Sequence, residues 1–362
     1  MNKDFKNVSY THGLHEVADN VFAYLQPDGG WGWSNAGLIA SEWSSLLVDT
    51  LFDLKLTKNM LDSMSSVTSA HPINVVVNTH ANGDHCYGNS LVGGENGAQI
   101  ITTEAAAVEM EAIPPSVLEA LMQIDLGEAT NSYIQDAFGS FDFSNIELPP
   151  PDRTFSGELQ LDVGGRTVEL IEVGPAHTSG DLLVHLPDAA TVFCGDILFI
   201  HGTPIIWDGP VSNWIDACDR ILGLEAEVII PGHGPLTDAT GVTAVRDYLN
   251  FVDSECRERH ALGQTAAEVI ADIDLGDFKE WGEWERIAVN VYAIFREIEK
   301  DQMSNLHSNY LAKWRILKKV ILNYKLTFAY SREVLQHEPQ QLVLSHELMQ
   351  RKGLSSPGSA LQ

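Results

Sequence analysis

Short apolar runs separated by turn residues mark the beginning of the chain. VFAYLQ, WGWSNAGLIA, SSLLVDTLFD and INVVVNTH alternate with Gly, Pro, Asn and Asp, a pattern typical of strands and hairpins. Between the last two runs, residues 55–66 carry a helical pattern. The fourth run ends at His80, and a helix is predicted within residues 86–92.

Strands and helices continue to alternate along the rest of the chain. Residues from about 104 to 140 are predicted to be helical, with a break at Pro114-Pro115. The run LQLDVGGRTVELIEVG predicts a hairpin that turns at Gly164-Gly165, and DLLVHLP, TVFCGD and EVIIPG predict further strands. NWIDACDRILGL and residues 240–300 carry helical periodicity. This alternation predicts an α/β fold built in layers.

Charge divides the chain into two parts. Lys and Arg number 22 against 50 Asp and Glu, a formal net charge of −28, and residues 303–362 hold eight basic and three acidic side chains. We predict a catalytic domain over residues 1–302, with a helical insert at about 104–140, and a basic helical tail over 303–362 whose end is disordered. The tail is either a helix that packs on the surface or binds a partner, or an arm that touches a membrane.

The composition excludes several classes of partner. An acidic body does not favour nucleic acid, and no apolar run is long enough for stable membrane insertion, so a small-molecule substrate is expected. The first residues lack the apolar core of a secretory signal. The four widely spaced cysteines, with no CxxC pair, argue against disulfides and favour the cytoplasm. Homodimer formation is left open.

Four loops that follow apolar runs carry residues suited to metal binding. They supply His80, Asn82, Asp84 and His85 after VVVNT, His177 after ELIEVGPA, Asp196 after TVFCG, and His233 after EVIIPG. Taken singly, such residues are more often found in turns or on the surface. In a layered α/β fold, however, the ends of neighbouring strands meet at one edge, so these loops are expected to converge. Imidazole and carboxylate ligands together suit zinc, with one position open for water.

The ordered motifs resemble those of the metallo-β-lactamase superfamily. The resemblance covers roughly residues 15–300 and rests on Leu47-Val48-Asp49-Thr50, His80-x-Asn82-x-Asp84-His85, Gly174-Pro175-Ala176-His177-Thr178-x-Gly180-Asp181, Phe193-Cys194-Gly195-Asp196 and Pro231-Gly232-His233-Gly234. It implies an αββα sandwich with a metal site between the edges of two sheets. It also implies that Asp49 orients the metal-binding loop rather than binding metal.

Asn82 departs from the family pattern, which has histidine at that position. The resemblance implies a first site of His80, residue 82 and His177, and a second site of Asp84, His85 and His233, with Asp196 bridging. Because an amide oxygen is a poorer zinc ligand than imidazole, the first site is expected to be weak or empty. We therefore expect one tightly bound zinc ion, held by Asp84, His85, Asp196 and His233.

The HxNxDH variant and its flanking segments also resemble the chlorothalonil hydrolytic dehalogenases. This resemblance implies a zinc-bound hydroxide that displaces chloride from an electron-poor ring. Asp84 either orients and deprotonates the water or is only a ligand, whereas His80 and His177 are candidates to bind substrate or carry a proton. Asn82 either donates its amide to the substrate or ties the loop together.

Aromatic residues predict the shape of the substrate pocket. Trp31, Trp33 and Trp207 are candidates to line it, together with His201, and they would favour flat apolar substrates. The sequence thus predicts a zinc hydrolase acting on an activated aryl halide or, alternatively, on a lactone, ester or β-lactam. A different chemistry on the same scaffold and a metal-poor binding protein are the further alternatives.

Overall fold

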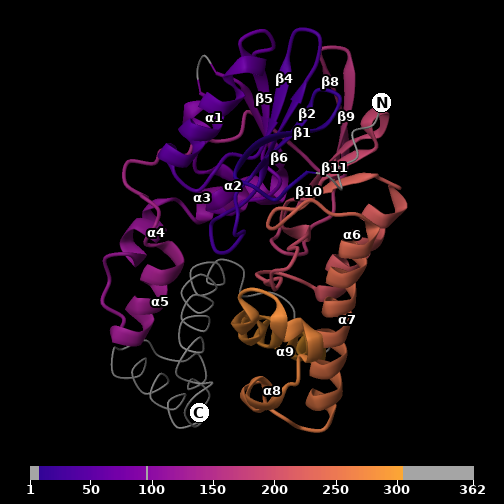
Figure 1. The fold of residues 1–362 in the computed structure, drawn as a ribbon. Coiled ribbons are helices and arrows are strands. Elements are labelled where there is room, and N and C mark those ends of the chain that lie inside the picture. The colour runs from indigo at the N-terminus through magenta and orange to yellow at the C-terminus, as the bar shows by residue number, and fades with distance from the viewer. Residues whose placement is uncertain (1–7, 95–96, 305–362) are drawn as a thin grey trace.

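The computed structural model describes residues 8–94 and 97–304, which fold around two β-sheets (Figure 1). The first sheet has the strand order β1-β2-β3-β4-β5-β6-β7 and the second β12-β11-β10-β9-β8. The strands of the first sheet are β1 (Gly13–Ala18), β2 (Val21–Leu25), β3 (Ala36–Ala40), β4 (Ser45–Val48), β5 (Ile73–Val77), β6 (Gln99–Thr103) and β7 (Arg153–Phe155). Those of the second are β8 (Glu158–Val163), β9 (Arg166–Glu172), β10 (Leu182–Leu186), β11 (Thr191–Phe193) and β12 (Val228–Ile230).

Strand direction brings the chemically important loops to one edge. β4, β5 and β6 run parallel in the first sheet, and β11 and β12 run parallel in the second. Parallel strands end on the same side of a sheet, so the loops that leave β5, β11 and β12 can approach one another. These strands are short and rich in Val and Ile, and β11 and β12 are buried along their whole length.

The core lies between the two sheets. Buried side chains of the first sheet, such as Ile39, pack with those of the second, such as Val184 and Phe193, in one hydrophobic cluster. Gly37 in β3 shows how closely the sheets approach, because a Cβ atom there would lie 2.0 Å from the Phe193 ring. Only glycine leaves room for that ring.

Helices cover the outer face of each sheet. α1 packs on the first sheet through Met60 and Met64, and α6 to α9 pack on the second through residues such as Trp214 and Leu249. The helices are α1 (Leu54–Thr68), α2 (Gly83–Cys86), α3 (Glu104–Ala112), α4 (Ser116–Leu121), α5 (Glu128–Phe138), α6 (Val211–Gly223), α7 (Ala239–Ala261), α8 (Ala266–Asp272) and α9 (Ile287–Ser304). The predicted αββα sandwich is confirmed.

Some predicted elements differ in position. The helix expected within residues 86–92 starts earlier, at Gly83 in α2, and a separate 3-10 turn occupies Asn89–Leu91. β1, β6 and β7 lie outside the predicted strands. The predicted tail falls, from residue 305 on, outside the described residues. Within the described part of the chain, no helix is both long and apolar enough to cross a membrane.

Candidate metal centre

Four loops bring six candidate ligands together at the edge of the sandwich. His80, Asp84 and His85 follow β5, and Asp84 and His85 lie on the short helix α2. The other three are His177, between β9 and β10, Asp196, just after β11, and His233, just after β12. All six side chains are buried. Gly232 must be glycine here, because a Cβ atom would lie 2.0 Å from Oδ1 of Asp196.

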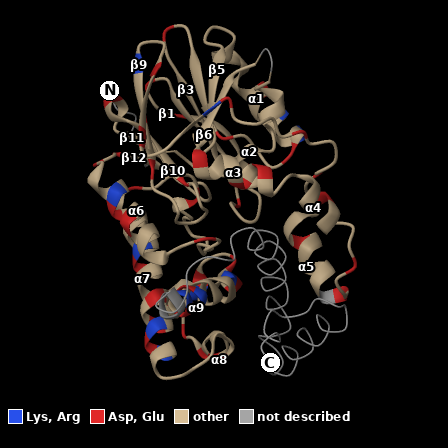
Figure 2. Cartoon of the chain, turned by 180° about the vertical axis from the view of Figure 1, so that it is seen from behind, with Lys and Arg blue, Asp and Glu red and all other residues tan. Residues whose placement is uncertain are grey.

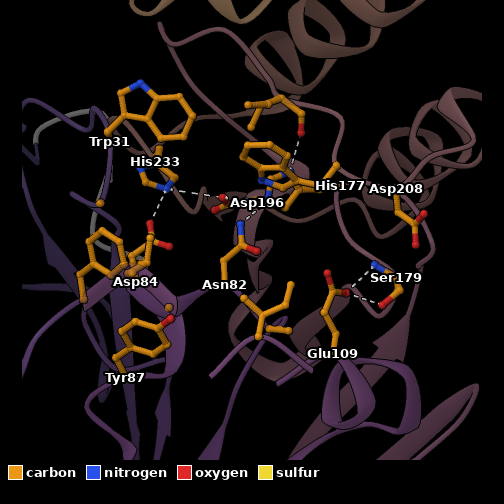
Figure 3. A pocket seen from close by; sticks show the side chains of 18 of the residues that line it. Trp31, Asn82, Asp84, Tyr87, Glu109, His177, Ser179, Asp196, Asp208 and His233 are labelled. Carbon is orange, nitrogen blue, oxygen red and sulfur yellow. Dashed lines mark hydrogen bonds and ion pairs between the residues drawn. The ribbon is translucent and has the colours of Figure 1, made fainter. Parts of the chain in front are cut away.

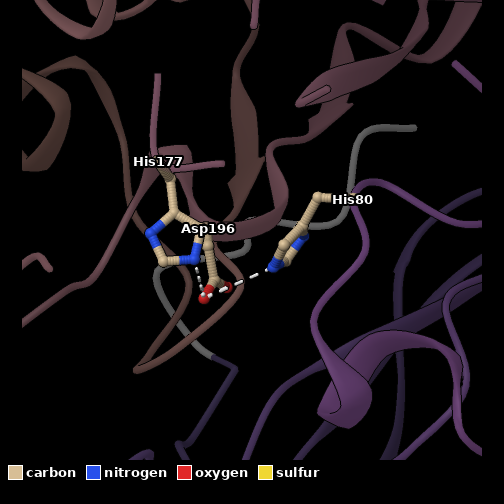
Figure 4. A group of neighbouring side chains, drawn as sticks. All are labelled: His80, His177 and Asp196. Atoms are coloured by element: carbon tan, nitrogen blue, oxygen red, sulfur yellow. Dashed lines mark ion pairs between the residues drawn. The ribbon is translucent and has the colours of Figure 1, made fainter. Parts of the chain in front are cut away.

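The ligand atoms form two groups that meet at Asp196. In one group, Asp196 Oδ2 lies 3.8 Å from His80 Nε2 and 3.3 Å from His177 Nε2 (Figure 4). The other group is Asp84, His85 and His233, in which His233 Nε2 lies 3.2 Å from Asp84 Oδ2. Asp196 also reaches this group, with Oδ1 3.0 Å from His85 Nε2. The carboxylate of Asp196 therefore lies within reach of both groups of candidate ligands.

Backbone carbonyls hold two of the histidines, His177 and His233, in the tautomer that leaves Nε2 available to a metal. The Nδ1 atoms of His177 and His233 lie 2.7 Å from Ile205 O and 3.0 Å from Gly29 O. A carbonyl oxygen only accepts, so each Nδ1 carries a hydrogen and, in the neutral ring, each Nε2 presents its lone pair to the centre.

Asp49 sets the orientation of the His80–His85 loop. Its carboxylate accepts hydrogen bonds from Thr79 N at 2.7 Å, from Thr79 Oγ1 at 2.8 Å and from His85 Nδ1 at 2.9 Å. Thr79 Oγ1 in turn lies 3.0 Å from His80 Nδ1, which fixes the ring of His80 as well. Asp49 thus stands behind two imidazoles without facing the metal position, as the sequence motif implied.

The buried polar atoms fit a metal ion. Among the described residues, His80 Nε2, His85 Nε2 and Asp196 Oδ1 have no hydrogen-bond partner although they are buried. Two acceptors such as His85 Nε2 and Asp196 Oδ1 repel each other at 3.0 Å unless a proton or a cation compensates them. Histidine and carboxylate ligands with this geometry suit zinc or a similar divalent metal.

The carboxylates give the Asp84 group a strong attraction for positive charge. Burial lowers the pKa of His233, but Asp196 and Asp84 outweigh it and raise the pKa to about 9. Burial opposes protonation of His85 too, yet Asp196, Asp84 and Asp49 raise its pKa well above the usual value. The same negative potential would attract a divalent cation.

His80 and His177 lie in a different electrostatic environment. Burial lowers the pKa of His177 to about 4, although Asp196 acts in the opposite direction. Burial and the neighbouring His85 lower the pKa of His80 well below its usual value. Both rings are therefore neutral at pH 7 in the metal-free protein.

Asn82 interacts with His177 directly. Its Nδ2 atom lies 3.0 Å from His177 Nε2, and Figure 3 shows the two side chains pointing toward each other. Because His177 Nδ1 holds the ring hydrogen, Nε2 must accept and the amide of Asn82 must donate. The amide therefore uses the lone pair with which His177 would bind a metal.

A cavity of about 420 Å³ opens onto the metal centre. Asn82, Asp84, His177, Asp196 and His233 form its floor, as seen in Figure 3. Its walls are mostly apolar and come from the loop before β3, from α3 to α5 and from the segment after β11. The wall residues include Trp31, Phe52, Tyr87, Val108, Leu118, Phe138, Phe199, Ile205 and Trp207.

Two of the four predicted pocket residues lie elsewhere. Trp31 and Trp207 line the cavity, with ring centroids 6.4 Å apart. Trp33 is absent from the lining because its ring packs against Phe141, at 4.9 Å, beneath the helical insert. His201 is exposed, lies in a bend of the backbone with φ of 63°, and is also absent from the lining.

Several lining residues were missed from the sequence. Tyr87 follows the His80–His85 motif by two residues, so its position beside the motif was a usable signal. Phe199 stacks on His233 with ring centroids 5.0 Å apart, and Arg286 precedes α9, far along the chain from every motif. Phe199 follows the candidate ligand Asp196 by three residues, so its position was a comparable signal, whereas nothing in the local sequence around Arg286 indicates the cavity.

The chain belongs to the metallo-β-lactamase superfamily. The sequence model of that superfamily matches residues 29–233, more than half of the 362 residues. The fold agrees, because solved structures of a metallo-beta-lactamase from Pontibacter korlensis and of the sec-alkylsulfatase Pisa1 from Pseudomonas sp. superpose on it. The first has a TM-score of 0.50 and 21% identity and covers 66% of this chain and 99% of its own. The second has a TM-score of 0.61 and 15% identity, and the match covers 94% of this chain and 57% of the alkylsulfatase chain.

Curated relatives match over parts of their length. The 2,4-dinitroanisole O-demethylase subunit alpha of Nocardioides sp. (strain JS1661) is 35% identical over 23% of this chain and 26% of its own. The beta-lactamase-like protein 2 homolog of Caenorhabditis elegans is 27% identical over 60% of each chain. A hydroxyacylglutathione hydrolase from Hyphomonas neptunium is 31% identical over 27% and 36%. The chain thus matches less than two thirds of each of these relatives. Membership of the superfamily, predicted from the sequence, is confirmed.

Proposed function

We propose that this protein is a zinc-dependent hydrolase that acts on a small, flat, electron-poor aromatic substrate, with hydrolytic removal of chloride from a chlorothalonil-like ring as the reaction. The observation that carries this proposal is the aromatic-walled cavity of about 420 Å³, which opens directly onto the metal centre. Flat rings pack well against Trp and Phe side chains, and the volume suits one substituted ring.

We assign one zinc ion to Asp84, His85, Asp196 and His233, and only weak binding to His80 and His177. The hydrogen bond from Asn82 to His177 Nε2 supports this difference, because it removes one ligand from the site of His80 and His177. When bound, zinc supplies a Lewis acid and a hydroxide nucleophile near neutral pH.

The residues of the chain position the reactants. Asp84 lines the cavity, with its side chain 12% exposed, so its carboxylate can orient the attacking water and accept a proton from it. The apolar walls exclude bulk water from the ring. In the overall reaction, a carbon–oxygen bond forms, the carbon–chlorine bond breaks and chloride leaves with its electron pair. One water is consumed, and one proton is released.

The relatives support this class of substrate. The name of the 2,4-dinitroanisole O-demethylase describes removal of a methyl group from the oxygen of a ring that carries two nitro groups. Nitro groups, like chlorine and nitrile groups, draw electrons from a ring and make it open to attack by hydroxide. The matched 86 residues therefore support an electron-poor ring as the substrate.

Acyl substrates are the second candidate. An ester, a lactone or a β-lactam would also fit a zinc-bound nucleophile, and the match to hydroxyacylglutathione hydrolases favours this alternative. A binding protein without metal is the third candidate. The Nε2 atoms of His80 and His85, which are buried without a hydrogen-bond partner within the described structure, argue against it.

Metal analysis combined with a substrate panel tests the proposal. The purified full chain is assayed with chlorothalonil, 2,4-dinitroanisole, a homoserine lactone, nitrocefin and p-nitrophenyl esters. We expect about one zinc per chain and release of chloride or methanol from the aromatic substrates. Asp84→Ala should abolish turnover, and His185→Ala, which alters a histidine paired with Glu169 outside the centre, should not. Turnover of acyl substrates alone would select the second candidate, and neither metal nor turnover would select the third.

A further inference from the structure

Arg286 is the buried basic side chain of the cavity. It is 1% exposed, and it is the only Lys or Arg among the buried residues of the described chain. It lines the cavity together with Trp31 and Phe199. Figure 2 shows further basic residues on α6, α7 and α9 and on α1 and β9, and none of them is buried. A guanidinium stays charged in proteins, so its burial is costly unless acceptors compensate it.

One edge of the guanidinium, formed by Nε and Nη2, makes no hydrogen bond within the described residues, although Nη2 forms an ion pair with Glu283. Nη1 donates to Thr203 O at 2.9 Å, whereas Nη2 lies 3.8 Å from the Glu283 carboxylate, too far for a hydrogen bond. Nε has no hydrogen-bond partner within the described residues, although it is buried. Nε and Nη2 form the side of the guanidinium that can bind two oxygens at once.

Aromatic rings hold this guanidinium in place. Its central carbon lies 4.1 Å from the centroid of Trp31 and 5.4 Å from that of Phe199. Phe199 in turn stacks on the metal-ligand candidate His233, so the guanidinium lies within about 10 Å of the His233 ring. One substituted benzene ring can span that distance. A preorganised donor pair costs little entropy when a ligand binds.

We propose that Arg286 determines substrate specificity by binding a planar two-oxygen substituent, a nitro or carboxylate group, on the ring of the substrate. The preferred substrate would then carry such a group in place of a nitrile of the chlorothalonil-like ring, because a nitrile presents one acceptor rather than two. This inference rests on the proposed function, which places the reacting carbon of the ring toward the metal centre. The opposite side of the ring then faces Arg286. Such a group supplies the two acceptors that Nε and Nη2 lack. It would also add to the charge compensation that the Glu283 carboxylate gives this buried cation from 3.8 Å.

Binding of three isosteric probes tests the role of Arg286 without turnover. Isothermal titration measures the affinity of the metal-loaded protein for 4-chlorobenzoate, 4-chloronitrobenzene and 4-chlorobenzamide. We expect the benzoate, the nitro compound or both to bind about ten-fold or more tightly than the benzamide, which presents an NH₂ group to the guanidinium. The preferred probe distinguishes carboxylate from nitro recognition.

Substitutions then attribute the preference to this side chain. Arg286→Gln should remove the preference for the two-oxygen probes. Arg286→Lys keeps the positive charge but loses the bidentate pair of donors, so it should weaken the preference. Arg220→Gln is the matched control, because Arg220 pairs with Glu158 on the surface. Thermal unfolding and metal content confirm that each variant is folded. Should Arg286→Gln not fold, the result for Arg286→Lys alone tests the role of Arg286.

The outcomes separate this inference from the proposed function. A preference that survives both Arg286 substitutions, or no preference in the wild type, would overturn the role of Arg286. If the preference depends on Arg286 but no aryl chloride is turned over, the specificity site stands and the proposed dehalogenation fails.

Discussion

The two sides of the metal centre contain similar side chains in different surroundings. The Asp84 side consists of Asp84, His85 and His233, and the His80 side of His80, His177 and the facing Asn82. Asp196 lies between them, 3.0 Å from His85 Nε2 and 3.3 Å from His177 Nε2. Both sides present imidazole nitrogens toward Asp196, so a count of ligands does not distinguish them.

The neighbours of the imidazoles distinguish the two sides. On the Asp84 side, Asp84 and Asp196 raise the pKa of His233 to about 9. On the His80 side, burial lowers the pKa of His177 to about 4, and an amide hydrogen of Asn82 faces its lone pair. A cation is thus favoured by charge on one side and opposed by a hydrogen bond on the other. The affinity of each side for metal depends on this second layer of contacts.

Removal of one histidine from each side gives the largest expected contrast. His233→Ala should lose the tightly bound metal and lower turnover by about a thousand-fold or more, because the nucleophile depends on that metal. His177→Ala should keep one metal per chain and lose only about ten- to a hundred-fold in activity. Elemental analysis and turnover of the best panel substrate measure both. Equal losses of metal in the two variants would show that the sides are equivalent.

Replacement of Asn82 should convert the weak side into a strong one. Asn82→His supplies an imidazole and removes the amide hydrogen bond to His177 Nε2, so metal content should rise from about one to about two per chain. Asn82→Ala frees His177 without adding a ligand and is the matched control, for which a smaller gain is expected. Equilibrium dialysis followed by elemental analysis gives the stoichiometry. Two tightly bound metals in the wild type would contradict the proposed role of Asn82.

The grouping of the candidate ligands was predictable because they follow short, mostly apolar strands. β5, β11 and β12 are each three to five residues long, and the third residue after each strand is a candidate ligand. β7 has only three residues, with Arg153 and Thr154 exposed, so no apolar run marks it. The local pattern of apolar residues thus predicted which loops meet at the floor of the cavity, but it did not predict every strand of the first sheet.

The cavity walls depend on contacts that no local pattern specifies. Trp31 and Trp33 occur two residues apart in the same Gly-rich segment, but only Trp31 lines the cavity. The choice is made by distant partners, since Trp31 packs near Trp207 whereas Trp33 packs on Phe141. In the sequence, Arg286 does not differ from other charged residues at the start of an amphipathic helix. Only the tertiary fold shows that it is buried.

Asp49→Asn is expected to have the smallest effect, and it tests how the Asp84 side obtains its strength. The carboxylate of Asp49 accepts from Thr79 N, Thr79 Oγ1 and His85 Nδ1, all three of them donors. An amide would place its own NH₂ group against one of these donors. His85 would then be held less firmly with its lone pair toward the metal, so zinc affinity should fall about ten- to a hundred-fold.

The matched control for this change is Asp53→Asn. Asp53 is another buried aspartate that accepts from a backbone amide, Leu56 N at the start of α1, but it does not contact a candidate ligand. Its substitution should lower the melting temperature and leave zinc affinity unchanged, as measured by competition with a chelator. If Asp49→Asn changed only the melting temperature as well, Asp49 would be a structural residue. The difference between the two sides would then have to come from Asp84 and Asp196 alone.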